Sequence, residues 1–207
     1  AVDIAYQSIT FDGGRGCINC SGIIYNGKDS YEEFRDRLAE KMASLEPLDP
    51  MNPRAEIPAM ATDPARGLYK FIRSRMDSSV KDITAKFRGS DEFLHVDNGL
   101  SYLLPTLLEV GEESEIRTDE YPHAFGTICR PNDYYPEELV EDSLAVGYLT
   151  DDPSKAKRLL RDPSIKKVFV NDQTFNMDIA QPHEGFQADF LYKSKATNYD
   201  GINNILK

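Results

Sequence analysis

Our interpretation of the fold starts from residues 11–22, which read Phe11-Asp12-Gly13-Gly14-Arg15-Gly16-Cys17-Ile18-Asn19-Cys20-Ser21-Gly22. Ahead of this segment, Val2, Ala5 and Ile9 recur at the spacing of one face of a helix. Behind it, residues 21–25 have the apolar content of a short strand. Because glycines interrupt helices, the chain is predicted to open as a helix, a glycine-rich loop and a strand.

The alternation of helices and strands continues along the chain. A helix is predicted at 30–45 with Ser30 as its cap, and another at 64–76 with Asp63 as its cap and Phe71 turned inward. Further strands are predicted at residues 83–87, 92–96, 101–104, 127–130, 146–150 and 166–170, and shorter helices at 137–144 and 154–160. This order predicts an α/β fold with a mainly parallel sheet and flanking helices.

Length and charge narrow the class of protein. The 207 residues suffice for one sizeable domain, which we place at 1–207. With 24 Lys and Arg against 35 Asp and Glu, the net charge of −11 argues against binding to nucleic acid or to an anionic membrane surface. No apolar run could span a bilayer, and no signal peptide is visible. Three cysteines in a chain of this length favour a reducing, cytoplasmic location.

The glycine-rich loop carries the chemistry that the residues themselves suggest. A cysteine there could act as a nucleophile whose own N–H stabilises an oxyanion, and Arg15 would favour its thiolate. The alternative is a turn with a small buried cysteine. Cys17 and Cys20 also form a C-x-x-C, which leaves a thiol redox protein as a further alternative. No metal site is predicted, because Cys129 stands alone and the histidines are scattered.

Several segments, in order, resemble the catalytic half of the aldehyde dehydrogenase superfamily along nearly the whole chain. In that family a helix with a D-x-A start leads to G-Q-x-C, whose cysteine is the nucleophile. Here Asp3-Ile4-Ala5 leads to Gly14-Arg15-Gly16-Cys17. The other matching segments are Gly99–Thr106 for G-aromatic-x-x-P-T, Asp119–Gly126 for E-E-x-F-G-P, Thr150–Ala156 for T-x-D…K-A, Val170-Asn171 for V-N, and Pro182–Gly185 for P-x-x-G.

The resemblance implies specific roles for three residues. Cys17 would be the nucleophile, while Glu120 and Phe125 would contact the nicotinamide ribose of NAD or NADP. The chain departs from the family where Arg15 replaces Gln and where extra residues separate Glu120 from Phe125. The family's nucleotide-binding half precedes the nucleophile, so we expect this chain to be part of a longer protein and to be inactive alone.

The resemblance thus predicts the catalytic part of an NAD(P)-dependent aldehyde dehydrogenase. An aldehyde would be oxidised through a thiohemiacetal and a thioester on Cys17. A CoA-acylating aldehyde dehydrogenase or an acyl-thioester reductase is the alternative within this chemistry. A non-catalytic oligomerisation or interaction domain is the alternative of another class. The expected partners are a small aldehyde and a second copy of the chain, as a homodimer or higher oligomer.

Overall fold

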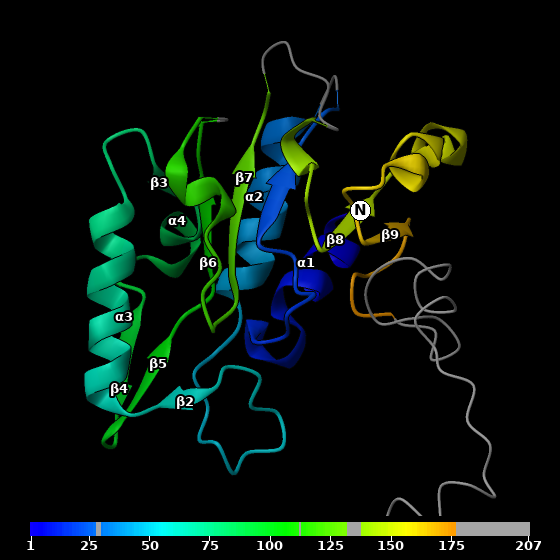
Figure 1. Ribbon diagram of the computed structural model, residues 1–207. Coiled ribbons are helices and arrows are strands. Elements are labelled where there is room, and N and C mark those ends of the chain that lie inside the picture. The colour runs from blue at the N-terminus through cyan, green and yellow to red at the C-terminus, as the bar shows by residue number, and fades with distance from the viewer. Residues whose placement is uncertain (28–29, 112, 132–137, 177–207) are drawn as a thin grey trace, which may run out of the picture.

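The computed structural model describes residues 1–27, 30–111, 113–131 and 138–176. Its main sheet has the order β1-β7-β6-β3 (Figure 1). Three strands run parallel, namely β1 (Gly22–Ile24) at one edge and the central strands β7 (Phe125–Cys129) and β6 (Thr106–Glu109), while β3 (Lys81–Asp82) is antiparallel at the other edge. This confirms the α/β class with a mainly parallel sheet.

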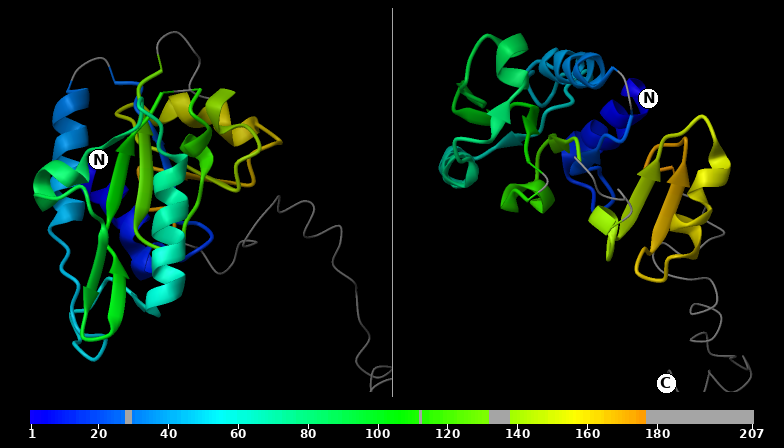
Figure 2. Two further views of the ribbon diagram at one scale, coloured as in Figure 1. Left: turned by 90° about the vertical axis from the view of Figure 1, so that its left-hand side faces the viewer. Right: turned by 90° about the horizontal axis from the view of Figure 1, so that it is seen from above.

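Helices cover both faces of the main sheet, as the views in Figures 1 and 2 show. On one face lie α1 (Val2–Thr10), α2 (Tyr31–Ala43) and α4 (Thr84–Arg88), and on the other lies α3 (Thr62–Arg75). The alternation of side chains along the strands divides the core accordingly. Leu107 and Ile128 pack with α1 and α2, whereas Leu108 and Phe125 pack with the α3 side.

Two smaller sheets flank this core. One is antiparallel with the order β2-β5-β4, formed by β2 (Ala59–Met60), β5 (Leu100–Leu103) and β4 (Leu94–Asp97). The other pairs β8 (Ala145–Tyr148) with β9 (Lys167–Val170) in parallel and lies to one side of the molecule (Figure 2). Short 3-10 turns complete the described chain at Phe11–Gly14, Glu115–Thr118, Glu138–Val140, Pro153–Lys157 and Leu159–Arg161.

One predicted strand, at 83–87, is wrong, because the structure has helix α4 there. Asp82 accepts the Ala85 N–H at 3.0 Å and the Thr84 hydroxyl, so its carboxylate caps the start of this helix. Gly89 then ends the helix with a left-handed φ of 72°. Side-chain capping therefore outweighs the strand propensity of Ile83 and Phe87.

Three smaller expectations also need correction. Ser30 occupies the N-cap position of α2 as predicted, but its side chain makes no cap bond, and Asp63 does not cap α3, which already begins at Thr62. Phe71 is exposed, not inward. The predicted helices at 137–144 and 154–160 are short 3-10 turns in their described parts, and residue 137 and Pro182–Gly185 lie outside the described residues.

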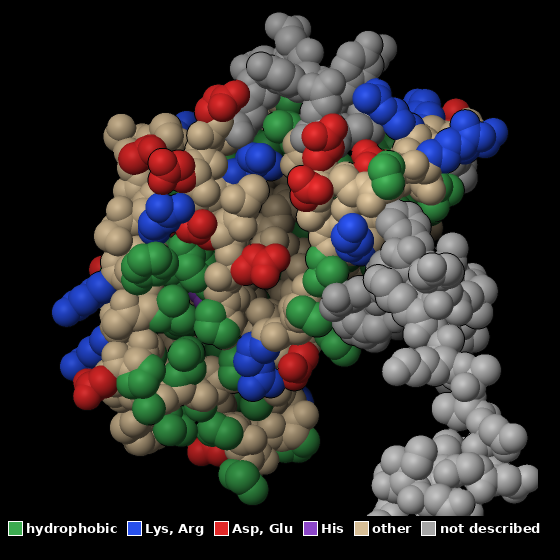
Figure 3. Space-filling view, viewed as in Figure 1, with side chains coloured by type: hydrophobic (Ala, Val, Ile, Leu, Met, Phe, Trp, Pro, Cys, Tyr) green, Lys and Arg blue, Asp and Glu red, His purple; other side chains and the backbone are tan. Residues whose placement is uncertain are grey.

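The surface drawn in Figure 3 mixes both signs of charge, with acidic and basic side chains scattered over it. Apolar side chains gather at its lower left, over α3 and the β4–β5 hairpin. Among the described residues, no helix is long and apolar enough to cross a membrane.

Candidate active site

Close packing of glycines positions the loop that carries Cys17. After α1 the backbone turns left-handed at Asp12, Gly13 and Gly14, with φ values of 49°, 65° and 77°. A Cβ on Gly13 would lie 2.6 Å from Pro58 Cδ. A Cβ on Gly14 would lie 2.4 Å from the carbonyl carbon and oxygen of His123. Only glycine fits this approach, so the loop is held directly against the segment that enters β7.

Cys17 itself lies in a tight turn closed by the Asn19 N–H, which donates to the Gly16 carbonyl at 3.0 Å. The Cys17 side chain is exposed, while the next residue, Ile18, is buried at 8% exposure and anchors the turn. Within the described part of the chain, the Cys17 N–H donates to no acceptor. An exposed thiol and an uncommitted backbone N–H thus belong to the same residue.

Arg15 contacts Asp12. Its Nη2 lies 2.8 Å from Asp12 Oδ1, and its Nε donates to the Asp12 carbonyl at 2.9 Å. Both side chains are about half exposed, at 49% and 57%. The Asp12 carboxylate therefore partly neutralises the Arg15 guanidinium and reduces the effect of its positive charge on a thiolate at Cys17.

The other two cysteines have different surroundings, and none of the three forms a disulfide. Cys20 is largely buried, its Sγ contacts the Gly22 carbonyl at 3.4 Å, and burial raises the pKa of its thiol to about 11. Cys129 is buried within β7. A redox pair needs an accessible thiolate, so the burial of Cys20 argues against the C-x-x-C interpretation.

The two cofactor candidates lie in different environments. Glu120 is exposed, and its Oε1 lies 3.5 Å from the Ser21 hydroxyl, next to the loop of Cys17. Phe125 is only 3% exposed, and its ring packs edge-on against Tyr121 at 4.7 Å in the core. The structure thus brings Glu120 next to the loop of Cys17 and places Phe125 beneath the surface.

His123, which no motif in the sequence singles out, is fully buried behind the glycine-rich loop. Its ring lies among Phe93, Tyr121 and Phe125, and neither ring nitrogen has a hydrogen-bond partner within the described residues. Burial lowers the pKa of His123 to about 3. The imidazole is therefore held neutral against the backbone that supports Gly14.

This burial makes the stability of the fold sensitive to acid. The pKa of His123 falls from 6.5 when unfolded to about 3 when folded, so between these values the unfolded chain binds the extra proton. Acidification from pH 7 to pH 5 should therefore cost about 2 kcal/mol through this residue. Urea unfolding at pH 7 and pH 5 measures this difference in the free energy of unfolding, and we expect the difference to be absent in His123→Leu. The exposed-histidine variant His95→Gln should keep it, and equal pH dependence in wild type and His123→Leu would contradict the assignment.

A hollow of about 900 Å³ borders the glycine-rich loop that follows α1. Its lining combines α1, the loop residues Phe11–Gly13 and Arg15, the segment around Ile57 and residues near Phe175. The rings of Phe11 and Phe175 stack there at 4.0 Å. Neither Cys17 nor Glu120 is among the residues that line this hollow. The described residues contain no cluster of three or more potential metal ligands.

Comparison with family profiles identifies one family. The sequence matches the profile of the aldehyde dehydrogenase family over residues 1–205, while a search of curated sequences gave no match. It is similar in structure to the glyceraldehyde-3-phosphate dehydrogenase GapN of Methanocaldococcus jannaschii complexed with NADP (18% identity, TM-score 0.72, 89% of this chain and 39% of that one). PnpE of Pseudomonas sp. WBC-3 has 21% identity and a TM-score of 0.72, with coverage of 89% and 38%.

An aldehyde dehydrogenase of Bacillus cereus, in its NAD+ complex, gives similar values: 18% identity, a TM-score of 0.72, and coverage of 89% of this chain and 37% of that one. At such identities these likenesses show the fold. The chain spans less than two fifths of the length of these three structures.

Proposed function

Because this chain belongs to the aldehyde dehydrogenase family, we propose that it is the catalytic domain of an NAD(P)-dependent aldehyde dehydrogenase with Cys17 as the nucleophile. The observation that carries this proposal is the turn at residues 16–19. It presents an exposed cysteine whose backbone N–H has no acceptor within the described residues. A nucleophile and an oxyanion donor in one residue suit addition to a carbonyl group.

The chemistry then follows from the position of Cys17. Its thiolate adds to the aldehyde carbon, and its N–H donates to the oxygen that becomes negatively charged. A nicotinamide cofactor, when bound, supplies the acceptor for the hydride that leaves this carbon. Cys17 is left with an acyl thioester, which water releases as the acid or coenzyme A releases as an acyl-CoA.

The residues present fit a cofactor ribose at one point. Glu120 is exposed and lies at the nucleophile loop, so its carboxylate can accept hydrogen bonds from ribose hydroxyls. Phe125 would support this site from the core, because its ring is 3% exposed. We expect the 207-residue chain on its own to form no NADH, since it spans at most 39% of the compared enzymes. The proposal also includes NAD or NADP as the cofactor, a cytoplasmic location, and assembly as a homodimer or higher oligomer.

The test uses two reagents that differ in whether their reaction forms an oxyanion. p-Nitrophenyl acetate acylates a thiolate through a tetrahedral oxyanion, with p-nitrophenolate leaving and an acetyl thioester remaining. Iodoacetamide alkylates the same thiolate by displacement of iodide, without an oxyanion. Peptide mass spectrometry identifies the cysteine that has reacted. The ratio of the acylation rate to the alkylation rate at Cys17 therefore reports on oxyanion stabilisation.

We expect this ratio to be about tenfold higher at Cys17 than in N-acetylcysteinamide, a modest value for one preorganised donor. Cys17→Ser should abolish the acylation, and Cys20→Ser should leave it unchanged. A ratio equal to that of the free thiol would refute the nucleophile assignment and favour a non-catalytic interaction domain.

A further inference from the structure

The side chain of Asn19 ties the turn that carries Cys17 to the end of α1. Its Oδ1 accepts the Gly16 N–H at 2.7 Å. Its Nδ2 donates to the carbonyls of Ser8 and Phe11, both at 3.0 Å, and lies 3.3 Å from that of Ile9. One amide group thus uses its acceptor on the turn and both its hydrogens on the helix end.

These carbonyls need partners from outside the helix. The last carbonyls of an α-helix have no intrahelical donor, and α1 ends at Thr10. Asn19 supplies donors to this end, and the Cys20 N–H adds a bond to the Ser8 carbonyl at 2.9 Å. The turn is therefore fixed relative to the helix axis by bonds on the C-terminal side of Cys17.

We propose that Asn19 is a positioning residue for Cys17. It holds the turn at residues 16–19 so that the sulfur and the backbone N–H of Cys17 can act on the same carbonyl group. This inference rests on the proposed nucleophilic role of Cys17. Asn19 contributes through the turn, because its own polar atoms are committed to Gly16 and to the end of α1.

Gly16 offers a second way to disturb the same contact. A Cβ at Gly16 would lie 2.6 Å from Asn19 Oδ1, and apart from its chain neighbours the only other atom of the described residues within 4 Å is Asn19 Cγ at 3.7 Å. Beyond its own chain neighbours, the closest contact of the Gly16→Ala methyl group is therefore with the Asn19 side chain. In an Asn19→Ala background the obstacle is gone, so the same substitution should be tolerated.

The experiment measures the acylation-to-alkylation ratio at Cys17 in the full chain, with the two reagents described above. Asn19→Ala and Gly16→Ala should each lower the ratio about tenfold, because the backbone N–H of Cys17 is then no longer held in position to donate to the oxyanion. The double variant should be no worse than Asn19→Ala alone. Asn26→Ala, which replaces an exposed asparagine, is the matched control and should leave the ratio unchanged.

Circular dichroism and thermal unfolding separate positioning from folding. A folded Asn19→Ala chain whose ratio stays within twofold of wild type would overturn the inference. If Asn19→Ala does not fold, Gly16→Ala decides in the same way. If neither folds, Asn19 serves the fold, and the inference is overturned as well. A wild-type ratio equal to that of N-acetylcysteinamide would instead refute the proposed function, which keeps the two failures distinct.

Discussion

Gly14→Ala is expected to destabilise the protein by about 3–5 kcal/mol, through strain and a collision that act together. Gly14 has a φ of 77°, which costs an L-residue roughly 1–2 kcal/mol. Its new Cβ would also lie 2.4 Å from the carbonyl carbon and oxygen of His123 and 2.5 Å from the Ala124 nitrogen. These are backbone atoms at the entrance to the buried strand β7, so they cannot turn aside as a side chain would.

Urea unfolding followed by circular dichroism gives the free energy of unfolding for this comparison. Gly89→Ala is the matched control: its φ is 72°, and no atom lies within 4 Å of the added Cβ. It should lose only the conformational cost of roughly 1–2 kcal/mol. Equal losses in the two variants would show that the loop does not press on the segment before β7.

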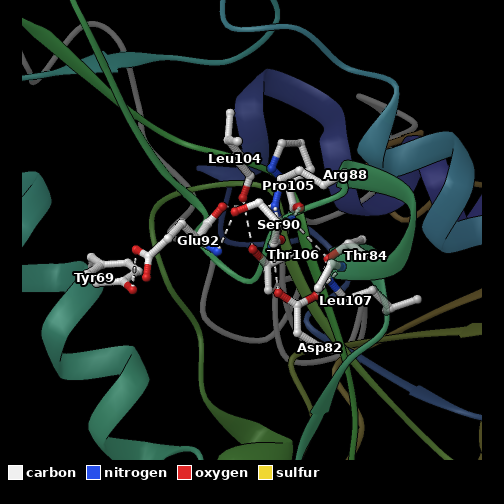
Figure 4. Close-up of polar contacts among 11 residues, drawn as sticks. Tyr69, Asp82, Thr84, Arg88, Ser90, Glu92, Leu104, Pro105, Thr106 and Leu107 are labelled. Atoms are coloured by element: carbon white, nitrogen blue, oxygen red, sulfur yellow. Dashed lines mark hydrogen bonds and ion pairs between the residues drawn. The ribbon is translucent and has the colours of Figure 1, made fainter.

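Arg88→Ala should cost about 3–5 kcal/mol, because it leaves a buried carboxylate without its partner. Arg88 Nη2 lies 2.7 Å from Asp82 Oδ2, and the two side chains are 8% and 6% exposed. The guanidinium also donates to the carbonyls of Glu92 and Pro105 at 3.1 and 3.3 Å (Figure 4). These bonds join the end of α4 to the start of β6.

Arg37→Ala provides the control on the surface. Arg37 pairs with Glu33 at 3.4 Å, but their side chains are 64% and 65% exposed, so its loss should cost less than about 0.5 kcal/mol. The double variant Arg88→Met with Asp82→Leu removes both buried charges, but it also removes the Asp82 cap of α4, so it should recover only part of the stability lost in Arg88→Ala. Urea unfolding measures the free energy of unfolding of each variant. If Arg88→Ala loses no more stability than Arg37→Ala, the Arg88–Asp82 pair is hydrated and the prediction is wrong.

The sequence predicts those elements whose pattern is local. Spacing of apolar residues predicts α1 and α2, and the run at Lys167–Val170 predicts β9. Strand β6 was missed because both its faces are buried, which removes the alternation that marks a half-exposed strand. Helix α4 was mistaken for a strand because its start depends on the Asp82 side chain, which composition does not reveal.

In the candidate site, too, some residues can be predicted from local sequence and others depend on distant contacts. Cys17 follows from a glycine-rich loop and a family motif, both visible in the sequence. The role of Asn19 depends on carbonyls at the end of a helix ten residues away, although asparagine in a glycine-rich turn is a recognisable signal. The burial of His123 depends on its neighbours Tyr121 and Phe125 and on Phe93 from a distant segment, and no local pattern reveals the contact with Phe93.

The parallel pairing of β1 with β7 has a consequence for how the protein is made. The Thr127 hydroxyl meets the Ser21 carbonyl across a sequence separation of 106, and the Ser21 hydroxyl meets Glu120 across 99. Contacts of such high contact order close large loops and form slowly. During synthesis, Cys17 leaves the ribosome long before β7 exists. The pairing that places the loop of Cys17 beside β7 is therefore completed late.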